Sequence, residues 1–265
     1  MITRVSGMDL ARIVTSEEFS TRLRDSSRVT AREQKETDFW VSLDPNNMKH
    51  SVSPYDVGTF IGMKIGSHGP ERDLPESYFQ MFHNHFHPEF TGPCVPSEGD
   101  LEFLGGEVHD FNLSGGYVKE YGAHIRFRIK FVNSIGKVRK DGGVELLFYQ
   151  GRSYEPLNEG SVEMIDHELE EFFLGKGLPE GIENYIVHSG IRTREVARVL
   201  GRFLNVAVVN VDGRYLRSRY GMREYKRRNL RNLGRKLNKL GYEIKVVDEP
   251  SIVSRILRGE DETSS

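Results

Sequence analysis

The chain has 265 residues and a single cysteine, Cys94, so an internal disulfide is excluded. It also lacks any apolar run near the ~20 residues that a membrane-spanning helix needs. Its first residues lack the apolar stretch of a signal peptide. Glycine-rich phosphate loops and internal repeats are missing as well. We therefore expect a protein of the reducing cytosol without a membrane association.

The net charge of −2 conceals an uneven distribution of charge along the chain. Residues 1–184 carry 19 Lys and Arg against 30 Asp and Glu, whereas residues 185–247 carry 16 against 4. Such asymmetry predicts two units or one strongly dipolar surface. The Gly- and Pro-rich segment at 175–181 is the expected boundary. We expect a first domain over 1–174, a small basic α/β extension over 182–250 and a disordered acidic tail over 259–265.

Local patterns predict a mixed central sheet with flanking helices, that is, an α/β or α+β fold. A capping residue, Thr15 or Ser16, followed by acids and spaced apolar residues, predicts a helix over 15–33. A second helix is expected to start at Ser97. Apolar or alternating runs predict strands over 39–43, 57–61, 76–87, 123–132 and 144–149. The basic segment predicts a helix, a strand, a helix and a strand, over 192–203, 206–211, 221–240 and 242–247.

Two histidines, His85 and His87, stand at the end of the strand predicted over 76–87. Strand side chains repeat every second residue, so both imidazoles lie on one side and can reach one ion. Asp100, delivered by the loop and turn that follow, can add a carboxylate oxygen. Three protein ligands of this kind leave a fourth tetrahedral position for water, as in a catalytic zinc site. The pattern predicts a zinc hydrolase.

The run His-x-His-Pro at 85–88 and the run Pro-Ser-x-x-Asp at 96–100 together resemble the signature of the JAMM (JAB/MPN) metalloprotease family. The resemblance covers roughly residues 10–150 and implies a JAB/MPN-like domain that binds zinc. It implies that His85, His87 and Asp100 are the zinc ligands. It further implies catalytic roles for Ser97, which helps to stabilise the transition state, and for Glu36, which acts as general base.

Glu36 is chosen because it stands 49 positions before His85, between the first predicted helix and the first strand, and Glu33 is held in reserve. The family cleaves peptide or isopeptide bonds, often after the C-terminal glycine of ubiquitin or a ubiquitin-like modifier. Two features depart from the family pattern. The nine-residue loop at 88–96 is about two residues longer than usual, an insertion that costs little loop entropy. The segment after Glu36 also lacks the usual small, glycine-containing strand.

Each of these residues also has a purely structural interpretation. Ser97 can cap the helix that follows it, and Asp100 can interact with the dipole of the same helix. Glu36 can be a solvated residue at a helix end. His83 stays in consideration as a partner of the ligands, and His109 and His124 as alternative ligands. Cys94 is interpreted as an incidental thiol.

The helix predicted over 221–240 has a rough apolar stripe and a basic remainder. The remainder includes Arg227, Arg228, Arg231, Arg235 and Lys236. Clustered Lys and Arg neutralise phosphates, so this helix predicts a surface for nucleic acid or another anionic partner. A solvated face, or a match to the acidic N-terminal part, is the alternative. Three functions therefore compete: a zinc peptidase or isopeptidase, an inactive scaffold of the same fold, and a nucleic-acid-associated protein.

Overall fold

The computed structural model describes residues 2–44, 49–58, 79–86, 92–102, 108–111, 125–130, 132–152, 157–178 and 190–248. The described strands are β1 Ile2–Val5, β2 Thr37–Asp44, β3 Lys49–Val52, β4 Asp56–Val57, β5 Phe79–Phe86, β6 Val108–Phe111, β7 Ile125–Lys130, β8 Val132–Val138, β9 Val144–Gln150, β10 Asn205–Val211 and β11 Tyr242–Asp248. The described helices are α1 Gly7–Val14, α2 Glu17–Glu33, α3 Glu98–Glu102, α5 Glu159–Leu174, α7 Thr193–Leu200, α8 Gly213–Leu216 and α9 Arg219–Leu237. Within this part of the chain, no helix is both long and apolar enough to cross a bilayer.

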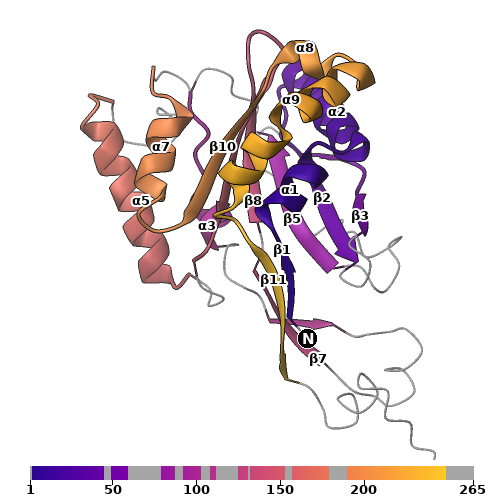
Figure 1. The fold of residues 1–265 in the computed structure, drawn as a ribbon. Helices are drawn as coiled ribbons and strands as arrows, with labels where there is room; N and C mark the ends of the chain where they lie inside the picture. Colours follow the sequence, from indigo (N-terminus) through magenta and orange to yellow (C-terminus); the bar gives the residue numbers. More distant parts are fainter. Residues whose placement is uncertain are drawn as a thin grey trace, which may run out of the picture.

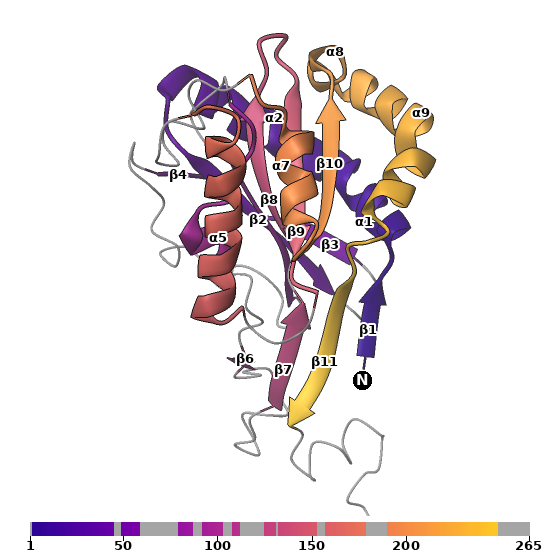
Figure 2. The same cartoon turned by 90° about the vertical axis from the view of Figure 1, so that its left-hand side faces the viewer.

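The strands form two sheets, which Figures 1 and 2 show from two sides. The larger sheet has the order β10-β9-β8-β5-β2-β3, and β4 pairs with β2 beside β3. Its pairs are antiparallel except for β5 and β8, which run parallel. The smaller sheet has the order β1-β11-β7-β6 and is antiparallel throughout. The predicted mixed sheet with flanking helices, an α+β class, is confirmed.

Helices cover both faces of the larger sheet, and each face has its own hydrophobic cluster. On one face α1, α2 and α9 pack on alternate residues of β2, where Phe39 lies at 5.5 Å from Phe19 between ring centroids. On the other face α3, α5 and α7 cover residues such as Ile135 and Leu147. The alternation follows from strand geometry, in which successive side chains point to opposite faces. A residue of the sheet is thus assigned to one face by its position in the strand.

Helix α2 precedes β2 directly and determines where that strand begins. Its N-cap is Ser16, whose hydroxyl accepts from the amide of Phe19, and it ends where Gln34 adopts a left-handed conformation with φ of 55°. Three residues later, the hydroxyl of Thr37 hydrogen-bonds to the hydroxyls of Ser26 at 2.5 Å and Thr30 at 2.7 Å. These buried bonds tie the beginning of β2 to the helix. Glu36, which lies between them in sequence, is therefore held on a fixed segment.

The basic segment shares the sheets and the core of the N-terminal part. Strand β10 pairs with β9 along its whole length, and β11 pairs with both β1 and β7. Helix α9 packs so closely on α1 that a Cβ on Gly7 would lie 2.5 Å from the Cα of Asn238. Leu233 and Leu237 of α9 belong to the same cluster as Leu10. The boundary predicted between 174 and 182 therefore lies between elements that pack on one another.

Most predicted elements are confirmed where the structure describes them, namely α2, β2, β5, β9, α7, β10, α9 and β11. One prediction is wrong in part, because the strand expected over 123–132 is divided between β7 and β8, which belong to different sheets. Of the strand expected over 57–61 only Val57 lies in a described strand, β4. Helix α5 has no counterpart among the predictions. The tail expected over 259–265 lies outside the described residues.

Candidate active site at the end of strand β5

The pairing of β2 with β5 determines which residues meet at the predicted metal site. In this antiparallel pair Asp38 is the partner of His85, and Thr37 is the partner of Phe86. Directly paired residues share a face of the sheet, so Asp38 and His85 occupy one face. Glu36 immediately precedes Thr37, and its carbonyl oxygen accepts from the amide of Gly58 at 2.9 Å. The structure thus brings the predicted base and the first predicted ligand to the same end of two neighbouring strands.

The face that carries the His85 position is the one covered by α3, α5 and α7. In the parallel pair of β5 and β8, His85 is the partner of Ile135, which belongs to the cluster on that face. Asn133, two residues earlier, is on the same face and pairs with Tyr149 of β9. Asp38 is buried there as well, with 8% of its surface exposed. Several polar residues therefore occupy core-facing positions in this small area.

Ser97 and Asp100 form a capping box at the start of α3. The amide and the hydroxyl of Ser97 both donate to Oδ2 of Asp100 at 2.7 Å, and the amide of Asp100 donates back to the Ser97 hydroxyl at 3.3 Å. The neighbouring Leu101 is fully buried and anchors the short helix. The structural interpretation of Ser97 as a helix cap is confirmed. The box also fixes the place of the Asp100 carboxylate.

Asp100 lies close enough to the sheet to affect Tyr149. Burial, and secondly the charge of Asp100, raise the pKa of the Tyr149 phenol well above its usual value. The phenol oxygen is fully buried, and neither it nor Oδ1 of Asn133 has a hydrogen-bond partner among the described residues. Buried polar atoms of this kind are rare in folded proteins. They mark the space between α3 and β8–β9 as unusually polar for a core.

The loop that leads into Ser97 is tied down by charged residues of the sheet. Lys137 donates to the carbonyl oxygen of Gly92 at 2.6 Å and forms an ion pair of 3.1 Å with Glu145. Glu145 accepts from the Thr193 hydroxyl at 2.6 Å, and that hydroxyl accepts from the amide of Cys94 at 3.1 Å. Residues 92–96 are all buried. This network holds the segment after the long loop in place.

Cys94 is a structural residue rather than a ligand or a nucleophile. Its side chain is 2% exposed, and burial raises the pKa of the thiol to about 12. A thiol with so high a pKa stays protonated near neutral pH, whereas metal binding and nucleophilic attack both require the thiolate.

The other predicted ligands are placed less completely. His85 is described by its backbone position, and His87 lies outside the described residues, as does His124. His109 pairs with Phe127 in the smaller sheet, so it does not share a sheet with His85. Within the described part of the chain, no three His, Cys, Asp or Glu side chains lie close enough to hold a metal ion.

Sequence reasoning missed four residues of this region: Asp38, Asn133, Tyr149 and Lys137. The signal was present for Asn133, which is polar at a strand position whose neighbour two residues later, Ile135, is in the core. Asp38 gave no such signal, because Glu36 and Trp40 are only partly buried. Tyr149 and Lys137 gave none either, since they approach Asp100 and Gly92 only through the pairing of strands that are distant in sequence.

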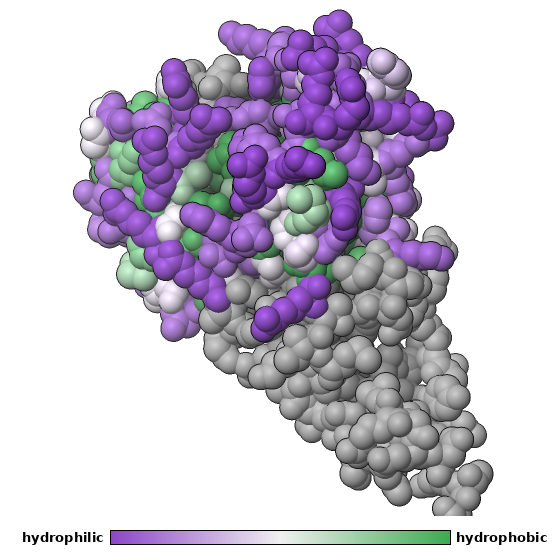
Figure 3. Space-filling model, viewed as in Figure 1, coloured by the Kyte–Doolittle hydropathy of each residue, from purple (hydrophilic) through white to green (hydrophobic). Residues whose placement is uncertain are grey.

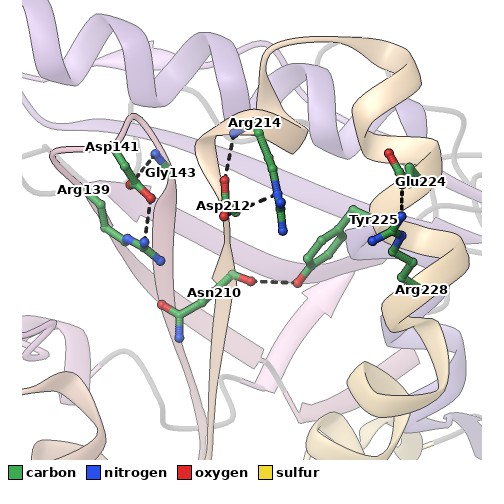
Figure 4. A network of polar contacts seen from close by, with 9 residues as sticks. All are labelled: Arg139, Asp141, Gly143, Asn210, Asp212, Arg214, Glu224, Tyr225 and Arg228. Atoms are coloured by element: carbon green, nitrogen blue, oxygen red, sulfur yellow. Dashed lines mark hydrogen bonds and ion pairs between the residues drawn. The ribbon is translucent and has the colours of Figure 1, made fainter.

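Of the predicted basic residues, those near the middle of α9 and those near its end differ in their surroundings. Arg228 forms an ion pair of 2.5 Å with Glu224, while the hydroxyl of Tyr225 donates to the carbonyl of Asn210 on β10 at 2.9 Å (Figure 4). That second bond fixes the helix on the edge of the sheet. Arg235 and Lys236, further along, line a hollow of about 350 Å³.

Comparison of the chain with known protein families, with curated proteins and with solved structures returns no match.

Proposed function

We propose that this protein is a zinc-dependent hydrolase of the JAMM type that cleaves a peptide or isopeptide bond. The pairing of β2 with β5 is the observation that carries the proposal. It places Glu36, just before β2, at the same end of the sheet as His85. The chain then continues to a helix whose first turn contains Asp100. Three separate segments thereby supply the residue types that this chemistry requires.

The donor set of the candidate site suits zinc. His85 and His87 supply two imidazoles and Asp100 supplies a carboxylate, a set that zinc accepts with a fourth position open for water. The buried polar atoms of Tyr149 and Asn133, without partners in the described structure, lie on the same face of the sheet. When bound, zinc lowers the pKa of its water toward about 7 and polarises the scissile carbonyl.

Three side chains of the protein have the remaining roles in proton transfer and in orienting the ligands. Glu36 takes the proton of the attacking water and passes it to the leaving amine. The hydroxyl of Ser97 has one proton, which it donates to Asp100, so its first task is to orient that carboxylate. To stabilise the transition state, as the resemblance implies, the hydroxyl has to turn toward the substrate oxygen. Asp38 occupies the register position opposite His85, where a carboxylate orients a ligating imidazole.

The substrate class rests on the resemblance alone. It is a conjugate of ubiquitin or a ubiquitin-like modifier, cleaved after the C-terminal glycine of the modifier. An amide bond at such an extended end reaches a site at the end of a strand more easily than one inside a folded domain.

Metal content is the first test, measured by elemental mass spectrometry on purified protein together with two variants. We expect about one zinc per chain in the wild type and a loss of zinc in Asp100→Ala, because two remaining ligands rarely hold the ion. His167→Ala, on the exposed surface of α5, is the matched control and should keep its zinc. Stoichiometric zinc in Asp100→Ala, or none in metal-replete wild type, contradicts the proposal. Cleavage of a modifier with a fluorogenic C-terminal amide then tests the substrate class.

A further inference from the structure

A groove runs between α7 and α9, with β10 as its floor. Both views of the fold place β10 between these two helices (Figures 1 and 2). The hollow has a volume of about 350 Å³, its floor consists of small apolar residues of β10, Val206, Ala207 and Val208, and Ala197 of α7 adjoins them. Figure 3 shows apolar surface between hydrophilic flanks in this region of the molecule. The hollow is within the size range of sites that bind small molecules or parts of larger ones.

The walls of the groove are basic. Arg194 and Arg198 stand four residues apart on α7, Arg231 and Arg235 are separated by the same interval on α9, and Lys236 and Lys239 lie at and just after the end of α9. Residues four apart on a helix lie on the same side. Each helix therefore presents a row of cations to the groove, and the two rows face each other across β10.

Within the described residues, none of these cations has a carboxylate partner. The acids on the two helices are engaged elsewhere: Glu195 of α7 with Lys176 at 3.1 Å and Glu224 of α9 with Arg228 at 2.5 Å. Lys236 is only partly exposed, and burial together with the charge of Arg194 lowers its pKa. Like charges held together in this way repel one another, and a bound anion relieves the repulsion.

The shape of the basic surface favours a long anion over a compact one. On α9 the row continues from Arg235 back to Arg231 and Arg227, all exposed. From Arg227 to Arg235 the helical rise amounts to roughly 12 Å, which is longer than a single phosphate group. Arginine is also the side chain that binds phosphate with two parallel hydrogen bonds. A row of this length matches consecutive phosphates of a polymer.

The apolar floor distinguishes a nucleic acid from an acidic protein segment. A base or sugar has a flat, weakly polar face that covers small side chains such as Val206 and Val208, whereas the carboxylates of an acidic peptide leave such a floor uncovered. We propose that the groove between α7 and α9 binds the backbone of a nucleic-acid strand, with one nucleoside on β10. Recognition through phosphates predicts binding that depends little on sequence.

Fluorescence anisotropy with 12-nucleotide single strands of mixed-sequence RNA and DNA tests the proposal on the full chain. We expect Arg198→Gln/Arg235→Gln to weaken binding about tenfold and to make its dependence on salt shallower, because fewer counterions are released. Both positions are exposed, so the fold should be kept, which circular dichroism checks. Arg28→Gln/Lys140→Gln removes the same charge from exposed sites elsewhere and should change the affinity less than twofold.

Two results would overturn the proposal. If poly-glutamate competes with the oligonucleotides as strongly as an unlabelled oligonucleotide does, the groove is a site for acidic proteins. If neither polymer binds, or if the two double variants behave alike, the cations only protect the free edge of β10 from pairing with another strand.

Discussion

The hydroxyl of Ser97 donates its single proton to Oδ2 of Asp100, and the amide of Ser97 donates to the same oxygen. Both donor–acceptor distances are 2.7 Å. A residue that caps a helix thus also determines where a predicted zinc ligand lies. The two interpretations of Ser97, as a cap and as a part of the site, are compatible because they use the same hydrogen bonds.

Ser97→Ala should therefore have two effects at once. Loss of the cap should lower the free energy of unfolding by about 1 kcal/mol, and loss of the hydrogen bond to Asp100 should weaken zinc affinity roughly 10- to 100-fold. Urea denaturation and competition with a zinc chelator measure the two quantities. Asn158→Ala, which removes the N-cap of α5, is the control: it should cost similar stability and leave zinc affinity unchanged. An unchanged zinc affinity in Ser97→Ala would show that Asp100 needs no such support.

Glu36→Gln should keep zinc and lose hydrolysis. The amide is almost the size of the carboxylate but cannot accept the proton, so we expect the rate to fall by roughly 10²- to 10⁴-fold. Glu163→Gln is the matched control, because Glu163 is an exposed glutamate of α5. The comparison is made with the modifier amide substrate at saturating zinc. Equal turnover in Glu36→Gln and wild type would assign the base to another residue.

Tyr149→Phe should not destabilise the metal-free protein. The change removes only the buried phenol oxygen, which has no hydrogen-bond partner among the described residues, so the free energy of unfolding should stay the same or rise by about 1 kcal/mol. Denaturant unfolding of chelator-treated samples measures it. A loss of more than about 1 kcal/mol would mean that the oxygen is hydrogen-bonded in solution.

The stability of the protein should fall as the pH rises above about 9. Burial raises the pKa of Cys94 to about 12 in the folded chain, whereas an unfolded cysteine titrates near 8.5. The unfolded state therefore loses its proton first, and between about pH 9 and 10 stability should decline by up to about 1.4 kcal/mol per pH unit. Cys94→Ala should lack this part of the slope. Parallel slopes in the two proteins would show that the thiol ionises equally in both states.

The sequence predicted local elements better than it predicted their neighbours. Strand β5 and helix α2 follow from patterns within a few residues, and both are observed. The parallel pairing of β5 with β8 joins residues about 50 positions apart and leaves no local trace, and the same holds for the proximity of Tyr149 to Asp100. The basic groove is similar, because Arg194 and Arg235 line one hollow only when α7 and α9 have both packed against β10.

Helix α5 is a different kind of omission, since its pattern was readable. Asn158 caps it, and the buried residues Val162, Ile165, Leu169 and Phe173 follow at intervals of three and four. The expectation of an independent basic extension had a physical cause as well. Charge asymmetry describes the surface of a protein. The core that joins α9 to α1 consists of apolar residues, and both the acidic and the basic segment contribute them.

The pairing of β1 with β11 also determines when this protein can fold during synthesis. The partner of Ile2–Val5, Tyr242–Asp248, is made more than 230 residues after it. At typical rates of about 5–20 residues per second, β1 waits roughly 12–50 s for it. During that interval the strand and the faces that α9 will cover are exposed to other chains. Production of the protein should therefore benefit from slow growth at low temperature and from chaperones that bind unpaired strands.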